Sequence, residues 1–124
     1  MNVIDSSAWL AYFAEEPNAK HFAPIIKLVH ELVVPTIILY EVFKVVLRES
    51  NESSALQAAA ALQKGTVVDL TPKLAIAASK LSLQHLIPMA DAIIFATTLA
   101  YGATFWTQDI HFKNISGVKY FPKK

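Results

Sequence analysis

Short apolar runs alternate along the chain with longer segments of helical spacing, and this alternation limits the possible folds more than any other feature. The strand-like runs are Asn2–Ile4, Leu32–Val34, Thr66–Leu70, Ala103–Thr107 and Val118–Phe121. Helices are expected over residues 8–14, 19–30, 36–49, 52–64 and 89–101, with a further helix that begins at Pro72. Because strand and helix alternate, we expect an α/β fold in which helices cover both faces of a short-stranded, mostly parallel central sheet.

Proline and glycine residues indicate where several of these helices begin or end. Pro72 favours the first turn of its helix, and Gly65 and Gly102 are expected at the C-caps of the helices that precede them. With 124 residues the chain is long enough for one layered core but too short for two, so we expect a single domain over residues 1–124.

Composition excludes several classes of protein. A hydrophobic content of 54% with 17% charged residues excludes disorder. No uncharged apolar run reaches the ~20 residues needed to span a bilayer, and the start of the chain lacks a basic, cleavable segment, so no membrane association is expected. The absence of cysteine excludes a disulfide scaffold and a thiolate zinc site, and it fits a cytoplasmic location.

The charge balance constrains the partners. A net charge of +1 argues against a protein that holds nucleic acid mainly through a strong basic field. The apolar excess suggests that part of the surface is buried in a partner. The segments 8–14, 19–30 and 37–47 are expected to offer apolar surface to a second copy or to a partner helix.

Four acidic residues stand at unusual positions. Asp5 ends the first strand, and Asp109 follows the strand at 103–107. Asp91 opens a helix whose next ten residues carry no charge, and Glu41 lies midway along an apolar helix. Since ligands of parallel α/β sheets bind outside the carboxyl ends of the strands, three of these acids are expected near one sheet edge.

Such a cluster needs a counter-charge. Two carboxylates about 4 Å apart repel by about 4 kcal/mol at an effective dielectric constant near 20. A hard divalent cation removes this repulsion, and carboxylate oxygens suit Mg²⁺ or Mn²⁺. Each acid alone has a simpler interpretation: Asp5, Asp91 and Asp109 as helix-start residues, and Glu41 as an ion-pair partner of Lys44. Their joint placement favours a shared metal site.

Four segments, in order along the whole chain, resemble the PIN-domain family, and specifically the VapC-type toxins of type II toxin–antitoxin pairs. The segments are Val3–Ser7, Leu39–Val42, Pro88–Ala96 and Trp106–Phe112. The resemblance implies a three-layer α/β/α PIN-like fold. It also implies an endoribonuclease that depends on Mg²⁺ or Mn²⁺ and cleaves RNA of the tRNA or rRNA class to inhibit translation. The implied partners are a cognate antitoxin, which neutralises the toxin, and a second copy in a homodimer.

The resemblance assigns roles residue by residue. Asp5, Glu41, Asp91 and Asp109 are implied as the catalytic and metal-binding acids, with Asp5 and Asp91 foremost as direct ligands. Ser6 and Thr107 would orient carboxylates or water molecules around the metal.

Other residues have two possible roles each. Lys44 and Arg48 could contact substrate phosphates or could be ordinary solvated residues of their helix. His111 suggests a general base, but it is expected to be a surface or packing residue. The aromatic side chains at 9, 12 and 13 could stack on bases, although their spacing is more typical of a core or a protein interface.

Three alternative functions remain open at this point. A phosphoacceptor receiver domain has this length, but it needs paired acids after the first strand and an acceptor aspartate after a middle strand. In this chain Asp5 stands alone after the first strand, and Asp69 is the only aspartate near the middle strand. A PIN-type RNA-processing nuclease outside any toxin pair would have the same acids. A non-catalytic PIN-like binding module could have kept them by descent.

Overall fold

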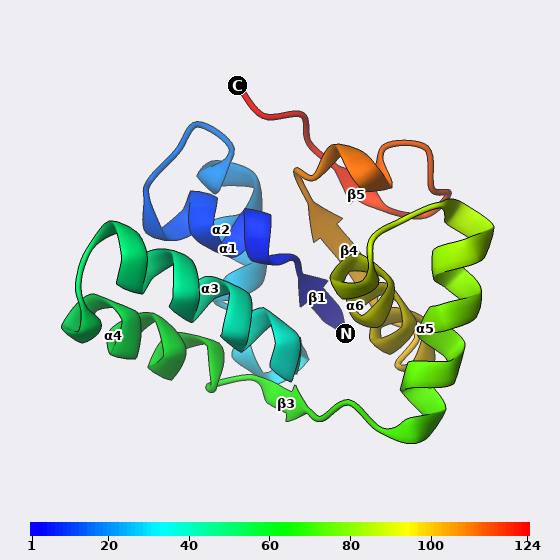
Figure 1. Cartoon of the computed structure of the whole chain (residues 1–124). Helices are drawn as coiled ribbons and strands as arrows, with labels where there is room; N and C mark the ends of the chain where they lie inside the picture. Colours follow the sequence, from blue (N-terminus) through cyan, green and yellow to red (C-terminus); the bar gives the residue numbers. More distant parts are fainter.

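The computed structural model describes residues 1–124, in which six α-helices and five short strands follow one another in near alternation (Figure 1). The strands are β1 (Asn2–Ile4), β2 (Val33–Pro35), β3 (Thr66–Val68), β4 (Thr104–Thr107) and β5 (Lys119–Tyr120). The helices are α1 (Ser6–Phe13), α2 (Ala19–Ile26), α3 (Thr36–Glu49), α4 (Glu52–Leu62), α5 (Pro72–His85) and α6 (Met89–Ala100). Two 3₁₀ turns complete the chain, η1 (Val29–Glu31) and η2 (Ile110–Phe112).

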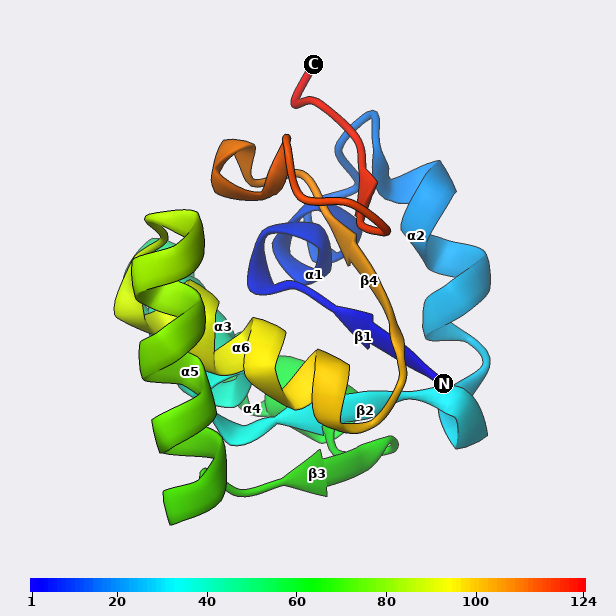
Figure 2. The same cartoon turned by 90° about the vertical axis from the view of Figure 1, so that its right-hand side faces the viewer.

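All strand pairs are parallel, which confirms the expected sheet. β4 lies between β1 and β5, with Val3 opposite Phe105 and Thr107 opposite Tyr120. β2 pairs with β3, and a single parallel bridge between Asn2 and Leu32 connects β1 to the β2 side. The strands therefore follow the order β3, β2, β1, β4, β5, as the side view in Figure 2 shows.

This order places a topological switch point between β1 and β4. From β1 the chain adds β2 and β3 on one side, and then crosses back to add β4 and β5 on the other. In parallel α/β sheets, the crevice for a ligand forms outside the carboxyl ends of the strands at such a point. The residues that follow Ile4 and Thr107 are therefore the first candidates for a functional site.

Helices flank the strands on both sides. In Figure 1, α1 to α4 lie on the left of the strands and the α5–α6 pair on the right, which confirms the three-layer α/β/α arrangement. The core is one continuous cluster of 23 buried residues. Its largest fully buried side chains come from the strands and from helices of both groups, and they include Trp9, Phe22, Ile38, Ile94 and Phe105.

Helix α6 is largely buried. Its residues from Asp91 to Thr98 are all buried, so the apolar character of this segment reflects burial inside the protein. No single helix is long and apolar enough to cross a membrane; α5 and α6 reach that length and composition only as a pair, and the two are bent by 114°.

Two expected helix ends are wrong. α2 ends at Ile26 rather than residue 30, because the chain turns there into the 3₁₀ turn η1 before β2. Gly65 is not a C-cap: α4 ends at Leu62, and Gly65 passes so close to β2 that a Cβ atom on it would lie 2.9 Å from Cβ of Leu32. The missing side chain thus permits β3 to approach β2. Gly102 follows α6 as expected, with a φ of +57°.

Candidate active site

The four acids predicted from the sequence come from four separate elements. Asp5 directly follows β1, and Asp109 follows β4 by two residues. Asp91 lies in the first turn of α6, and Glu41 lies in the second turn of α3. Burial raises the pKa of Asp5, Glu41 and Asp91, and the negative charge of Asp109 raises each of the three further, so these three carboxyl groups all lie within electrostatic reach of Asp109.

Asp5 is held by hydroxyl groups. Its side chain is 2% exposed, and its Oδ2 accepts hydrogen bonds from the hydroxyls of Ser7 at 2.8 Å and Thr107 at 2.7 Å. Asp5 occupies the N-cap position of α1, but its side chain makes no capping hydrogen bond to this helix. Its carboxylate accepts the hydroxyls of Ser7 and Thr107 instead. The simple interpretation of Asp5 as a capping residue is therefore wrong.

Thr107 connects the ends of the two central strands. Its hydroxyl donates to Asp5 after β1 and accepts the backbone N–H of Asp109 at 2.9 Å. The side chain is fully buried, so water does not compete for either hydrogen bond. Thr107 thereby fixes the position of Asp109 relative to Asp5, which is the geometry that its predicted orienting role requires.

Ser6 provides a matching contact for Glu41. Its hydroxyl donates to Oε1 of Glu41 at 2.9 Å, which fixes this carboxylate against the start of α1. The ammonium group of Lys44 lies 5.5 Å from the ring centroid of Tyr40 and within 3.4 Å of its hydroxyl. No ion pair joins Lys44 to Glu41, so the pairing considered from the sequence is wrong.

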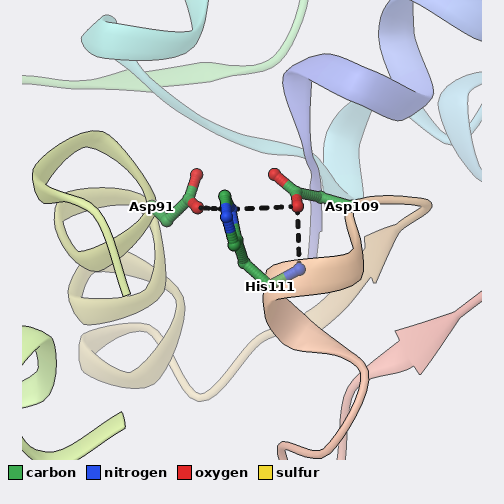
Figure 3. A group of neighbouring side chains, drawn as sticks. All are labelled: Asp91, Asp109 and His111. Carbon is green, nitrogen blue, oxygen red and sulfur yellow. Dashed lines mark hydrogen bonds and ion pairs between the residues drawn. The ribbon is translucent and has the colours of Figure 1, made fainter. Parts of the chain in front are cut away.

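His111 lies between two of the acids, which the sequence did not predict. Its Nδ1 atom is 2.8 Å from Oδ2 of Asp91 and 3.1 Å from Oδ1 of Asp109, while its backbone N–H donates to Asp109 at 2.9 Å (Figure 3). One ligand atom from each of the three residues lies within 4.8 Å of the others. His111 is a surface residue, as expected, and its side chain is half exposed, but the short turn η2 directs its Nδ1 atom back toward α6.

Burial and mutual repulsion act together on these carboxyl groups. Burial, followed by the negative charges of Asp109 and Asp5, raises the pKa of Asp91 to about 7, although His111 opposes the rise. Burial also raises the pKa of Asp5, and the hydroxyls of Thr107 and Ser7 oppose it. The pKa of Glu41 is raised by burial and lowered by its hydrogen bond from Ser6.

The donor set fits a divalent cation. No lysine or arginine forms an ion pair with any of the four acids, and His111 is their only basic contact within 4.0 Å. A cluster of carboxylates with so little positive charge is costly at neutral pH, and oxygen-binding dications remove that cost. Asp91 and Asp109 each have an oxygen atom in a group of ligand atoms that lie within 4.8 Å of one another, and Asp5 is near enough for its charge to raise the pKa of Asp91.

A groove about 710 Å³ in volume begins beside the acids. Ser7 and Gln108 line it near the site, and the side chains of α1, α3 and α4 continue it, among them Leu10, Phe13 and Val46. Lys123 from the C-terminal segment lines both this groove and a second hollow that includes Asp109. Lys123 is thus a basic residue beside the acids that the sequence analysis did not single out.

The remaining residues singled out from the sequence lie elsewhere. Arg48 is exposed and pairs with Glu49 at 3.4 Å, a contact of little energetic weight at a surface. Trp9 is buried in the core and stacks on Phe13, which confirms the packing interpretation. Asp69 is exposed beyond β3 and cannot serve as the buried acceptor of a receiver domain.

Fold and site together define a parallel α/β protein with an acidic cluster at the switch point of its sheet. Residues 3–118 match the sequence model of the PIN domain. The chain therefore belongs to the PIN-domain family. No curated protein matches the sequence.

Solved structures share this fold at low sequence identity. VapC20 of Mycobacterium tuberculosis, described as a sarcin-ricin loop cleaving toxin, superposes with a TM-score of 0.80 at 20% identity, over 98% of this chain and 100% of that one. A toxin–antitoxin complex from Klebsiella pneumoniae gives a TM-score of 0.78 at 19% identity, over 95% of each chain. VapBC2 from Rickettsia felis, bound to a promoter DNA fragment, gives 0.74 at 16% identity, over 99% of this chain and 98% of that one.

The raised pKa of Asp91 predicts how stability depends on pH. The folded protein favours the protonated carboxyl, so this contribution is complete below pH 3.8 and is lost as the pH rises through about 7. In EDTA, we expect the free energy of unfolding to fall by about 3 kcal/mol from pH 5 to pH 8, relative to Asp91→Asn. Urea unfolding of both proteins across this range measures the difference. The prediction is contradicted if the free energy of unfolding changes with pH in the same way in wild type and in Asp91→Asn.

Proposed function

We propose that this protein is a VapC-type toxin, an endoribonuclease that depends on Mg²⁺ or Mn²⁺ and cleaves tRNA or rRNA in the cytoplasm to inhibit translation. The observation that carries the proposal is the convergence of Asp5, Glu41, Asp91 and Asp109 without a lysine or arginine partner, at the ligand-binding edge of a PIN fold. The similarity in fold to a sarcin-ricin loop cleaving toxin supports RNA as the substrate.

The mechanism assigns a task to each acid. Asp91 and Asp109, with Asp5, would hold a divalent cation, which would supply Lewis acidity toward the scissile phosphate and lower the pKa of a water molecule. Glu41, fixed by Ser6, would orient the attacking water or accept its proton. Thr107 would hold Asp5 and the backbone of Asp109 in place throughout the reaction.

Substrate binding requires few positive charges in this proposal. Lys123 lines the hollow that includes Asp109, which supports a contact with a backbone phosphate of the RNA. Lys44 and Arg48 stay candidates for more distant phosphate contacts on the exposed side of α3.

Two protein partners belong to the proposal. The groove between α1, α3 and α4, whose lining is part apolar and part polar, would accept a segment of a cognate antitoxin, and complexes of that kind are among the similar folds. A homodimer would cover apolar side chains that are otherwise in contact with water. The most exposed of these lie at the end of α5, in the α5–α6 connection and at the start of α6, rather than on the helices expected from the sequence: Leu83 is 81% exposed, Leu86 87% and Met89 73%.

The test is RNA cleavage by the purified chain. Intact tRNA and ribosomal RNA are incubated with the protein in Mg²⁺, in Mn²⁺ and in EDTA, and the fragments are mapped by primer extension. We expect discrete fragments only in the presence of a divalent cation. Asp69→Asn is the matched control, because it removes an exposed carboxylate outside the cluster. Absence of cleavage would favour the non-catalytic alternative, and cleavage without an antitoxin reading frame beside the gene would favour an RNA-processing nuclease.

A further inference from the structure

His111 is the ligand-capable side chain of the cluster to which the mechanism above assigns no task. Its ring is half exposed, yet its Nδ1 edge faces Asp91 and Asp109 (Figure 3). We propose that Nδ1 of His111 is a direct ligand of the bound cation, beside Asp91 and Asp109, and that the site therefore selects Mn²⁺ over Mg²⁺. The inference rests on the divalent cation of the proposed function and adds a nitrogen atom to its oxygen ligands.

The spacing of the three ligand atoms supports this assignment. Nδ1 lies 2.8 Å from Oδ2 of Asp91 and 3.1 Å from Oδ1 of Asp109. Adjacent ligands of an octahedral ion at about 2.1 Å are separated by about 3.0 Å. The two contacts are thus close to this separation, and the three ligand atoms all lie within 4.8 Å of one another, which is near enough for one cation to contact all three.

The nitrogen donor decides between these two ions. Mg²⁺ is a hard cation that prefers oxygen ligands and water, whereas imidazole binds first-row transition metals more readily. His111 can offer the lone pair of Nδ1 when its proton is on Nε2, and the half-exposed ring allows Nε2 to reach solvent. A site composed only of carboxylates would not distinguish the two ions by this route.

A second role for His111 would produce the same contacts. Its Nδ1–H could simply donate a hydrogen bond that spaces the two carboxylates. His111→Asn separates the two roles, because the asparagine amide can occupy the position of Nδ1 and donate a hydrogen bond but is a poor nitrogen ligand. His111→Ala removes both capabilities. His30→Asn is the matched control, since this histidine is exposed in η1 and has no contact with the acids.

Binding of Mn²⁺ and Mg²⁺ is measured by calorimetry on the full chain, without RNA. We expect His111→Asn and His111→Ala to weaken Mn²⁺ binding about 10- to 100-fold and Mg²⁺ binding less than about 3-fold. Pulsed electron paramagnetic resonance of the Mn²⁺-loaded protein is expected to show coupling to an imidazole ¹⁴N nucleus. This coupling should be lost in both His111 variants and kept in His30→Asn.

Several outcomes would overturn the inference. It is wrong if the wild-type protein binds no Mn²⁺, if it shows no ¹⁴N coupling, or if His111→Asn binds Mn²⁺ as tightly as wild type. Failure of the proposed function is distinguishable, because a protein that binds Mn²⁺ through His111 but cleaves no RNA would keep the inference and refute the nuclease.

Discussion

Replacing Asp5 with asparagine is expected to reduce RNA cleavage about 10²- to 10³-fold, which corresponds to about 3–4 kcal/mol of lost transition-state stabilisation. Asparagine has nearly the same shape as aspartate, and its side-chain oxygen can still accept the hydroxyls of Ser7 and Thr107. The substitution therefore removes the negative charge while the hydrogen bonds that fix the side chain remain. Single-turnover cleavage of the mapped RNA substrate measures the loss.

Two controls make this result specific to the site. Asp69→Asn removes the same charge from an exposed position beyond β3 and should cleave RNA at the wild-type rate. In EDTA, circular dichroism should show that Asp5→Asn retains its helices and melts no earlier than wild type, because a raised pKa indicates that the buried charge destabilises the fold. Normal cleavage by Asp5→Asn would refute the assignment of this residue.

The fold could be predicted from local signals wherever those signals are strong. α3 was expected over residues 36–49 and is observed over Thr36–Glu49, because Pro35 and Asn51 interrupt the helical pattern near both ends. The end of α2 and the role of Gly65 could not be predicted in this way. Both depend on how β2 and β3 approach each other, which is a tertiary contact with no local pattern.

The acids of the site were accessible to sequence reasoning for a general physical reason. Strand ends of parallel sheets meet at one edge, which identifies Asp5 and Asp109, and charges within apolar helices are costly, which identifies Glu41 and Asp91. Their roles in metal binding and catalysis stay predictions. The contacts of His111 and Ser7 with the acids were not predicted, because they depend on the direction in which short turns orient a side chain.

The two-residue spacing from Asp109 to His111 was the available signal for the histidine. In the 3₁₀ turn η2, Asp109 occupies the N-cap position and accepts the backbone N–H of His111. This hydrogen bond brings the two side chains to the same face of the turn. A histidine two residues after a capping aspartate is therefore a candidate ligand, even where the sequence places both residues in a loop.

Replacing Asp91 with asparagine is expected to change stability in opposite directions without and with a divalent cation. In EDTA at pH 8, the variant should be more stable than wild type by about 2–4 kcal/mol, because wild type carries a buried carboxylate whose pKa is raised to about 7. With Mn²⁺ at 100 times its dissociation constant, wild type should gain about 2.7 kcal/mol and the variant much less. Thermal unfolding under both conditions measures the reversal, with Asp69→Asn as the control that responds like wild type. If Asp91→Asn were less stable than wild type in EDTA, the cost of burying this carboxylate beside Asp109 and Asp5 would not be what the cation relieves.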